Sequence, residues 1–415
     1  MFDIANINNF IFIIILIIGL FIEIICLIKS RDNDNKPKRR DKKEPKFAIL
    51  IPARDESKVI EGLLKSIKKQ NVNMEDVFVI VEDLNDKTVA ITENYQGNIF
   101  VREDLTKQRK GYALDECFKY LKKKGKEYDL YFIFDADNIL DDHYFENMLV
   151  SYQEGYDLVI SYRNCKNGNE SIISAASSLT FSVMNEFINK SKNECNGNVV
   201  VSGTGFFVTQ EIVKKWHGFP FHSLTEDYEL TLYSIVNEMC TFYNDKAMFY
   251  DEQPITYKQS KTQRIRWIKG YLEARKKYIP LIRKKKLNNC KNYGSVLSEK
   301  LGIFQFLLII IGIAGLLINN LSFAIYYFIN ESNIYLHYLI YFISFIIIIY
   351  LILVLFTFYI LQKEKKKLNI NKKMRFKVLF FHPIFLITYI PCFLKALTSK
   401  EVSWQKIEHH NKEIV

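Results

Sequence analysis

Two aspartates stand where an apolar run of the sequence ends, and their spacing suits a cation site. Residues 132–140 read FIFDADNIL, so Asp135 and Asp137 directly follow strand-forming residues. An apolar run of this length predicts a buried strand, and two acids at its end can turn toward one point. Paired carboxylates repel each other unless a cation lies between them. We expect a divalent ion, Mg²⁺ or Mn²⁺, which commonly bridges a carboxylate to a diphosphate. The alternative is a solvated turn with helix-capping acids.

A second acidic group lies in TEDYELT, residues 225–231. An acid such as Asp227 at the start of a helix is by default a cap or a first-turn residue. In an active site it could instead take a proton from an attacking hydroxyl, as a general base.

A third group combines cations with an indole in QRIRW, residues 263–267. Arg264 and Arg266 could bind phosphates through paired hydrogen bonds, and Trp267 offers a flat face to a sugar ring. The alternative is an amphipathic helix on a membrane surface, which Trp and Arg also favour. Lys110, in RKGYAL, is a further candidate for a phosphate contact.

The segments around these residues predict an α/β sheet. Strand patterns at 46–52, 76–83, 98–104, 130–138 and 157–164 alternate with helical ones, including GYALDECFKYLKKK at 111–124. Such alternation is typical of a mostly parallel sheet flanked by helices, which binds ligands beyond the carboxyl ends of its strands. We therefore expect the acids that follow these strands to converge at one edge; they are Asp55, Glu82, Asp83, Asp135 and Asp137.

Composition places the ends of the chain in a membrane. The chain has 415 residues and a net charge of +11, and its basic clusters lie next to apolar runs. Membrane proteins carry an excess of Lys and Arg on the cytoplasmic side of their spans, which would explain these clusters. A nucleic-acid role would need a basic stripe with interleaved aromatics in the soluble part, which is not visible. The seven cysteines form no CxxC pair and indicate neither a zinc site nor a disulfide framework.

Three apolar runs, at 10–28, 301–329 and 338–361, are long enough to span a bilayer. A fourth, at 374–397, contains Pro383 and Pro391 and either spans or lies in the interface. Glu23, inside the first run, lies near the interface or faces another helix. The flanking charges place the N-terminus outside and the middle of the chain in the cytoplasm.

The order of the motifs resembles that of a known family. IPARDES, VEDLNDKT, RKGYAL, FDADN, SGTGF, TEDYELT and QRIRW follow one another from Ile51 to Trp267, between one N-terminal apolar run and several C-terminal ones. This resembles the membrane-bound inverting glycosyltransferases of family 2, which include synthases of cellulose, hyaluronan and poly-N-acetylglucosamine. The resemblance implies a GT-A fold, a UDP-sugar donor and a divalent metal on its diphosphate.

The resemblance also implies roles for individual residues. Asp135 and Asp137 match the metal-binding pair, with Asp137 favoured as the direct ligand, and Asp227 matches the base, with Glu226 beside it in the motif. Glu82 or Asp83 would read the uracil, and the choice between them stays open. Residues implied in donor binding are Ala53, Arg54, Glu56, Lys110, Asp135, Gln263 and Arg264. Arg266 and Trp267 would act beside diphosphate and acceptor, in a pocket lined by Gly203, Thr204 and Gly205.

The expected domains are a transmembrane anchor (1–30), a basic linker (31–46), a cytoplasmic GT-A domain (47–295), transmembrane or interfacial helices (296–398) and a tail (399–415). The expected activity is hexosyl transfer to a growing polysaccharide or oligosaccharide at the plasma membrane, with a homodimer or accessory membrane protein as possible partner. The alternatives are sugar transfer to a lipid acceptor, phosphoryl or nucleotidyl transfer by a two-metal site, and a nucleotide-binding membrane scaffold.

Overall fold

The computed structural model describes residues 2–31, 37–41, 44–287, 292–399 and 413–414. The tail expected at 399–415, with Trp404 and His410, lies almost wholly outside the described residues.

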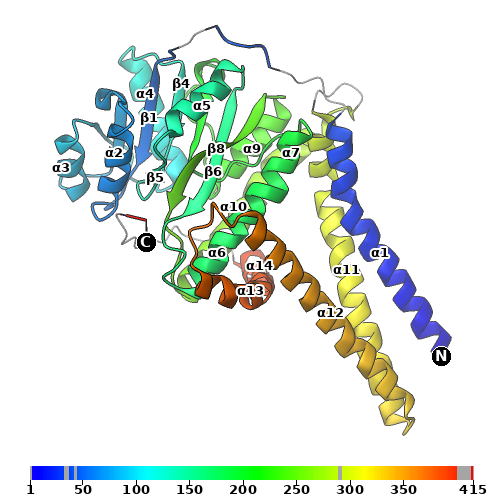
Figure 1. Ribbon diagram of the computed structural model, residues 1–415. Helices are drawn as coiled ribbons and strands as arrows, with labels where there is room; N and C mark the ends of the chain where they lie inside the picture. Colours follow the sequence, from blue (N-terminus) through cyan, green and yellow to red (C-terminus); the bar gives the residue numbers. More distant parts are fainter. Residues whose placement is uncertain (1, 32–36, 42–43, 288–291, 400–412, 415) are drawn as a thin grey trace.

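An eight-stranded sheet in the order β3-β2-β1-β4-β7-β6-β8-β5 forms the centre of the catalytic part (Figure 1). Pairing is parallel from β3 through β2 and β1 to β4, and also between β6 and β8, whereas β7 and β5 run antiparallel to their neighbours. The expectation of a mostly parallel sheet is therefore confirmed, with two reversed strands. The strands are β1 (Phe47–Pro52), β2 (Val77–Val81), β3 (Asn98–Val101), β4 (Leu130–Ile133), β5 (Ile139–Leu140), β6 (Leu158–Cys165), β7 (Phe206–Thr209) and β8 (Thr241–Asp251).

Helices cover both faces of this sheet, which explains why its strands are continuous apolar runs. On β1, Ala48 and Leu50 belong to one core and Ile49 and Ile51 to the other, because successive side chains point to opposite faces. The helices of the catalytic part are α2 (Ile60–Lys68), η1 (Met74–Asp76), α3 (Lys87–Asn94), α4 (Lys110–Lys123), α5 (Tyr144–Gln153), α6 (Ile172–Val183), η2 (Met184–Lys190), α7 (Ser191–Glu194), α8 (Gln210–Val213), α9 (Glu226–Val236) and α10 (Tyr257–Lys284).

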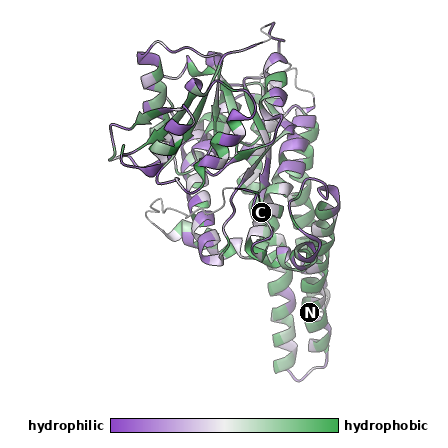
Figure 2. Cartoon of the chain, turned by 60° about the vertical axis from the view of Figure 1, so that its left-hand side comes forward, coloured by the Kyte–Doolittle hydropathy of each residue, from purple (hydrophilic) through white to green (hydrophobic). Residues whose placement is uncertain are grey.

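Long apolar helices lie at both ends of the described chain, as expected. They are α1 (Phe2–Ser30), α11 (Tyr293–Ile329), α12 (Ile334–Lys363) and the pair α13 (Lys372–Ile387) and α14 (Tyr389–Thr398). By length and composition, α1, α11, α12 and the joined segment Lys372–Thr398 could each cross a membrane. Apolar residues dominate the long helices, whereas hydrophobic and hydrophilic residues alternate along the elements of the catalytic part (Figure 2).

The first and eleventh helices pack closely along their length (Figure 1). A Cβ on Gly312 would lie 2.7 Å from Leu16 Cβ, so this contact requires a residue without a side chain. Asn8 and Asn9 donate hydrogen bonds of 3.1 Å to Asn319 and Asn320 across the same interface. Such contacts between small and polar residues are typical of helix association in bilayers.

Glu23, on α1, faces another helix. Its carboxylate accepts a 2.9 Å hydrogen bond from Ser298 Oγ of α11 and lines the large cavity described below. Of the two positions expected from the sequence, facing another helix is therefore the one observed.

The fourth apolar segment bends at Thr388, between α13 and α14. Figure 1 shows both helices nearly end-on beneath α10 and α6, whereas α1, α11 and α12 run lengthwise. By length and composition this segment could also cross a membrane, so an interfacial position stays a prediction.

Candidate active site

Asp135 and Asp137 follow β4 in a turn that is bonded to the SGTGF segment. The backbone N–H of Asp135 donates to Thr204 Oγ1 at 2.8 Å, and the Thr204 hydroxyl in turn donates to Asn138. Asp137 is buried, and its Oδ2 accepts the backbone N–H of Glu252 at 2.8 Å. The side chain of Asp135 is 42% exposed. One acid is therefore held firmly while its neighbour remains accessible.

Lys110 connects this turn to the start of α9. Its Nζ donates to Asp135 Oδ1 at 2.6 Å and to the carbonyl of Gly203 at 2.7 Å, and it lies 3.8 Å from Glu226 Oε1. Burial would lower the pKa of Lys110, but attraction to Asp135 and Glu226 outweighs burial and raises it. Lys110 therefore remains a cation among these acids.

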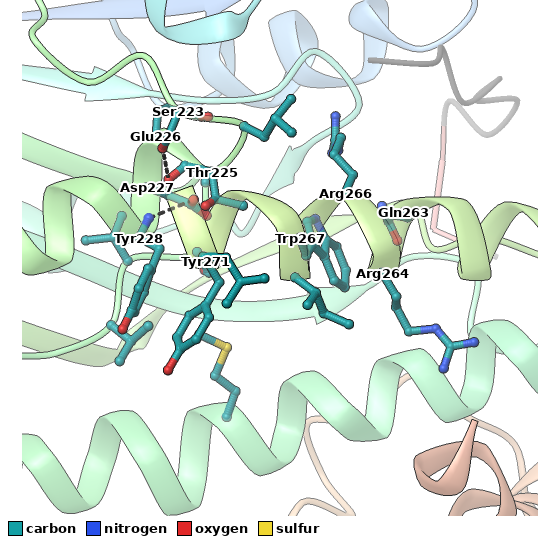
Figure 3. Close-up of a pocket in the computed structure, with 18 of the residues that line it drawn as sticks. Ser223, Thr225, Glu226, Asp227, Tyr228, Gln263, Arg264, Arg266, Trp267 and Tyr271 are labelled. Atoms are coloured by element: carbon teal, nitrogen blue, oxygen red, sulfur yellow. Dashed lines mark hydrogen bonds between the residues drawn. The ribbon is translucent and has the colours of Figure 1, made fainter. Parts of the chain in front are cut away.

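Asp227 lies in the first turn of α9, where its Oδ1 accepts the Tyr228 backbone N–H at 2.8 Å (Figure 3). Its carboxylate approaches Gly203, whose φ is +88°; a Cβ there would lie 3.3 Å from Asp227 Oδ2. Glycine thus permits both the turn and the close approach. Burial raises the pKa of Asp227, and burial raises that of Glu226 to about 7 against the opposing attraction of Lys110. Two adjacent carboxyls with raised pKa values suit proton transfer near neutral pH.

The two arginines of QRIRW point to opposite sides of α10 (Figure 3). Residues two apart on a helix lie about 200° apart, whereas residues three apart lie close together. Gln263 and Arg266 therefore share a face that Arg264 cannot share. Trp267 packs edge-on against Phe181 of α6, with ring centroids 5.9 Å apart.

Arg264 is buried against α13 and α14. Its Nη1 donates to Thr388 Oγ1 at 2.7 Å, and its guanidinium carbon lies 4.6 Å from the ring centroids of both Phe385 and Tyr389. Arg264 also lines the cavity described below, and the phosphate-binding role expected for it stays a prediction. The sequence suggested two equivalent cations, but the helical period separates them.

Replacing Arg264 with Ala is expected to loosen the docking of α13 and α14 by about 1.5–3 kcal/mol, the range for a hydrogen bond to a charged group. Hydrogen exchange should become faster over 372–398, while UDP affinity in the presence of Mn²⁺ changes less than about twofold. Arg266→Ala is the matched comparison, expected to weaken UDP binding and leave exchange at these helices unchanged. Equal loss of UDP affinity in both variants would contradict this assignment.

In the turn after β2, charged pairs distinguish Glu82 from Asp83. Glu82 lies 3.0 Å from Arg54 Nε and 3.3 Å from Arg102 Nη1, and it lines the cavity. Asp83 is exposed, and its carboxylate accepts from the backbone N–H and side-chain amide of Asn85. The geometry favours Glu82 as the acid that faces a bound base.

One cavity of about 1900 Å³ brings most of the expected residues together. Asp55, Asp83, Thr204 and Gly205 are outside its wall. Gly205 instead packs under Phe249, where a Cβ would lie 2.2 Å from the ring. The expected residues in the wall are Ala53, Arg54, Glu56, Glu82, Lys110, Asp135, Asp137, Gly203, Glu226, Asp227, Gln263, Arg264, Arg266 and Trp267.

Sequence reasoning missed Arg163 and Asp251, which also line this cavity. Arg163 Nε donates to Asp251 Oδ2 at 2.8 Å, and Nη1 donates to the Ser202 carbonyl at 2.8 Å. Its guanidinium lies 3.8 Å from the Phe181 ring centroid. Arg163 thereby connects the turn before Gly203 to the aromatic side chains beside α10. Both residues stand at the carboxyl ends of strands β6 and β8, the same signal that identified Asp135.

The acidic pair fits a divalent ion that also binds a diphosphate. Within the described ranges, no cluster of three or more His, Cys, Asp or Glu side chains could hold an ion. Two carboxylates leave most positions of a six-coordinate ion to other oxygens, such as phosphate and water. The backbone bond to Asp137 fixes its orientation, as outer-shell partners of metal ligands do.

Comparisons with known proteins agree with this architecture. The model of the family described as "Glycosyltransferase like family 2" matches residues 45–270. The probable glycosyltransferase YdaM of Bacillus subtilis (strain 168) is 24% identical over 410 residues, covering 91% of this chain and 90% of YdaM. The mannosyltransferase PcManGT from Pyrobaculum calidifontis, solved with GDP-Man and Mn²⁺, superposes with a TM-score of 0.61 at 13% identity, covering 95% of this chain and 100% of PcManGT.

The superposition supports the GT-A fold, and the family match spans both acidic motifs and Trp267. The chain is a glycosyltransferase and belongs to the glycosyltransferase-like family 2.

Proposed function

We propose that this glycosyltransferase transfers a hexosyl group from a UDP-sugar to an acceptor hydroxyl with inversion at the anomeric carbon. The observation that carries the proposal is the position of Asp227. This buried carboxylate lies against Gly203 and shares one cavity with Asp135, Asp137 and Arg266.

In the proposed reaction, Asp227 accepts the proton of the acceptor hydroxyl as its oxygen attacks the anomeric carbon. The bond from that carbon to the diphosphate breaks, and UDP departs. One displacement from an α-linked donor gives a β-glycoside. Arg266 lines the cavity, and its Nε has no hydrogen-bond partner among the described residues, so it can donate to the departing phosphate.

The donor would bind at the other end of the cavity. Glu82 would accept from the uracil, held in place by Arg54 and Arg102. Asp135 and Asp137 would bind Mg²⁺ or Mn²⁺, which would neutralise the diphosphate. Lys110 now pairs with Asp135 and would turn to a phosphate oxygen in the complex.

The proposed location is the plasma membrane, with the catalytic domain in the cytoplasm. Lys29, Lys300 and Lys363 lie at the catalytic ends of α1, α11 and α12, whereas the connection at 330–333 between α11 and α12 carries no Lys or Arg. This excess of Lys at the catalytic ends of the helices supports a catalytic domain on the cytoplasmic side. The α13–α14 pair would lie in the cytoplasmic interface.

The test is product analysis with the full chain in lipid nanodiscs, Mn²⁺ or Mg²⁺, and UDP-glucose, UDP-N-acetylglucosamine, UDP-galactose and GDP-mannose in turn. We expect one UDP-sugar to release UDP and to give a β-linked product by NMR. An α-linked product would contradict inversion, and turnover of GDP-mannose alone would contradict the UDP donor.

The raised carboxyl pKa values predict an acid limb in the pH profile. A base works only when deprotonated, so activity should fall as pH drops through the raised pKa of Asp227, above the ordinary carboxyl range. Glu226 is largely uncharged below its pKa of about 7, so Glu226→Gln removes little charge there and should leave the acid limb of kcat/KM in place. The exposed Glu146→Gln is the control. A limb that moves to lower pH in Glu226→Gln alone would show that an ionised Glu226 raises the pKa of Asp227.

A further inference from the structure

The cavity continues past Asp227 toward the apolar helices, and along the way its wall changes from aromatic to mainly aliphatic side chains. Near Asp227 it is formed by Trp267, Tyr271 and Tyr228. Beyond them it runs between α11 and α14 as a groove, here called the apolar groove. Its walls are Ile303, Phe306, Leu307 and Ile310 of α11 with Ile390 and Leu394 of α14.

We propose that the acceptor is a membrane lipid whose apolar chain lies in the apolar groove and whose headgroup presents a nucleophilic oxygen to Asp227. This inference rests on the proposed function and decides between the two acceptor classes that the sequence left open.

The chemistry of the groove walls favours a lipid chain over a saccharide chain. A sugar polymer passing aliphatic side chains would lose water from each hydroxyl without gaining a hydrogen bond, which is costly. A hydrocarbon chain that enters from the bilayer has no hydroxyl groups to desolvate, so it can lie against the same aliphatic side chains without that cost.

Most polar side chains near the groove are already bonded to protein. Ser298 Oγ donates to Glu23. Glu299 pairs with Arg275, which also donates from Nη2 to the Glu299 carbonyl at 3.0 Å. Gln305 adds one amide to the wall, too little to solvate a row of sugar hydroxyls.

The groove also opens sideways, toward the proposed bilayer. The described parts of α11 and α14 meet at Phe306 and Phe393, whose ring centroids are 5.5 Å apart. The aliphatic residues on either side of this contact remain exposed. A lipid could therefore slide in from the bilayer without its chain crossing water, while its headgroup reaches the aromatic side chains of α10.

Leu307 and Ile311 provide a matched pair of variants. Both lie on α11 and both are 47% exposed, but only Leu307 lines the cavity. A Trp at Leu307 would fill the groove, whereas a Trp at Ile311 would stay outside it. Gly302→Leu is a second blocking variant, since a Cβ there meets nothing closer than Arg275 Nη1 at 3.9 Å.

The experiment uses the full chain in nanodiscs of phosphatidylethanolamine and phosphatidylglycerol, with the radiolabelled donor found above. The added probes are polyprenyl phosphate, diacylglycerol or a soluble oligosaccharide. We expect label in the organic extract. Leu307→Trp and Gly302→Leu should lower kcat/KM for the lipid at least about tenfold, with Ile311→Trp unchanged. UDP release to water, measured without added acceptor, should stay within about twofold in all variants.

Label on diacylglycerol would show an alcohol headgroup, as the base role of Asp227 requires. Label on polyprenyl phosphate alone would keep the lipid acceptor but contradict the acceptor hydroxyl of the proposed function. Label found only in an ethanol-insoluble polymer or in the soluble oligosaccharide, at equal rates in Leu307→Trp and Ile311→Trp, would overturn the lipid acceptor while leaving the proposed function intact. A wild type that releases no UDP from any donor would overturn the proposed function and this inference with it.

Discussion

Replacing Asp227 with Asn is expected to lower kcat for sugar transfer by about 10²–10⁴-fold, the usual contribution of a general base. Asn keeps the shape of the side chain and can still accept the Tyr228 N–H bond, so the first turn of α9 should remain intact. What is lost is the site that takes the acceptor proton. Single-turnover transfer from the labelled donor measures the loss.

UDP affinity separates this effect from damage to the fold. Asp227 is not expected to bind the donor, so the dissociation constant of UDP with Mn²⁺ should change less than about threefold. Asp142→Asn, at an exposed acid paired with Lys69, is the control for removing one negative charge. Retention of more than a tenth of wild-type kcat by Asp227→Asn would assign the base elsewhere.

The second large effect is expected at Asp137. Changing it to Asn removes the charge that a divalent ion needs, and metal-dependent UDP binding should weaken by about 100-fold or more. The Asn oxygen can still accept the Glu252 backbone N–H, so the melting temperature should change little. Isothermal titration with UDP, with and without Mn²⁺, measures the effect.

UDP binding by wild type and by the variant is also compared without metal. Wild type and Asp137→Asn should bind UDP equally weakly in EDTA, because the lost interaction passes through the ion. Asp135→Asn should have a smaller effect on the metal-dependent part, since Asp135 is half exposed and paired with Lys110. An Asp137→Asn variant that still responds fully to Mn²⁺ would exclude this residue as a metal ligand.

Much of the fold could be predicted from local pattern. Continuous apolar runs such as 47–52 mark strands buried on both faces, and the acids after them mark the edge where ligands bind. The position of Asp135 follows from those signals, and that of Asp227 from the pattern of a helix start. The opposite directions of Arg264 and Arg266 also follow from the helical period, once the segment is known to be one helix.

Other features depend on contacts between distant parts of the chain. Asp83 and Glu82 are adjacent, and only the cations Arg54 and Arg102 distinguish them. Arg163 and Asp251 pair because β6 and β8 are neighbours in the sheet, although β7 lies between them in sequence. The bend at Thr388 is stabilised by Arg264, more than a hundred residues earlier. These partners cannot be identified from the local sequence.

The pairing of α1 with α11 has a consequence for how the protein is made. The two helices are joined by asparagine pairs and glycine contacts, but the whole catalytic domain separates them in the chain. At ~10 residues per second, the ribosome needs roughly half a minute to reach α11 after finishing α1. During that time Asn8, Asn9 and Glu23 would lie in the bilayer before their partners exist. In the proposed membrane location, α1 would depend during this period on the insertion machinery, or on a neighbouring copy, to shield its polar side chains.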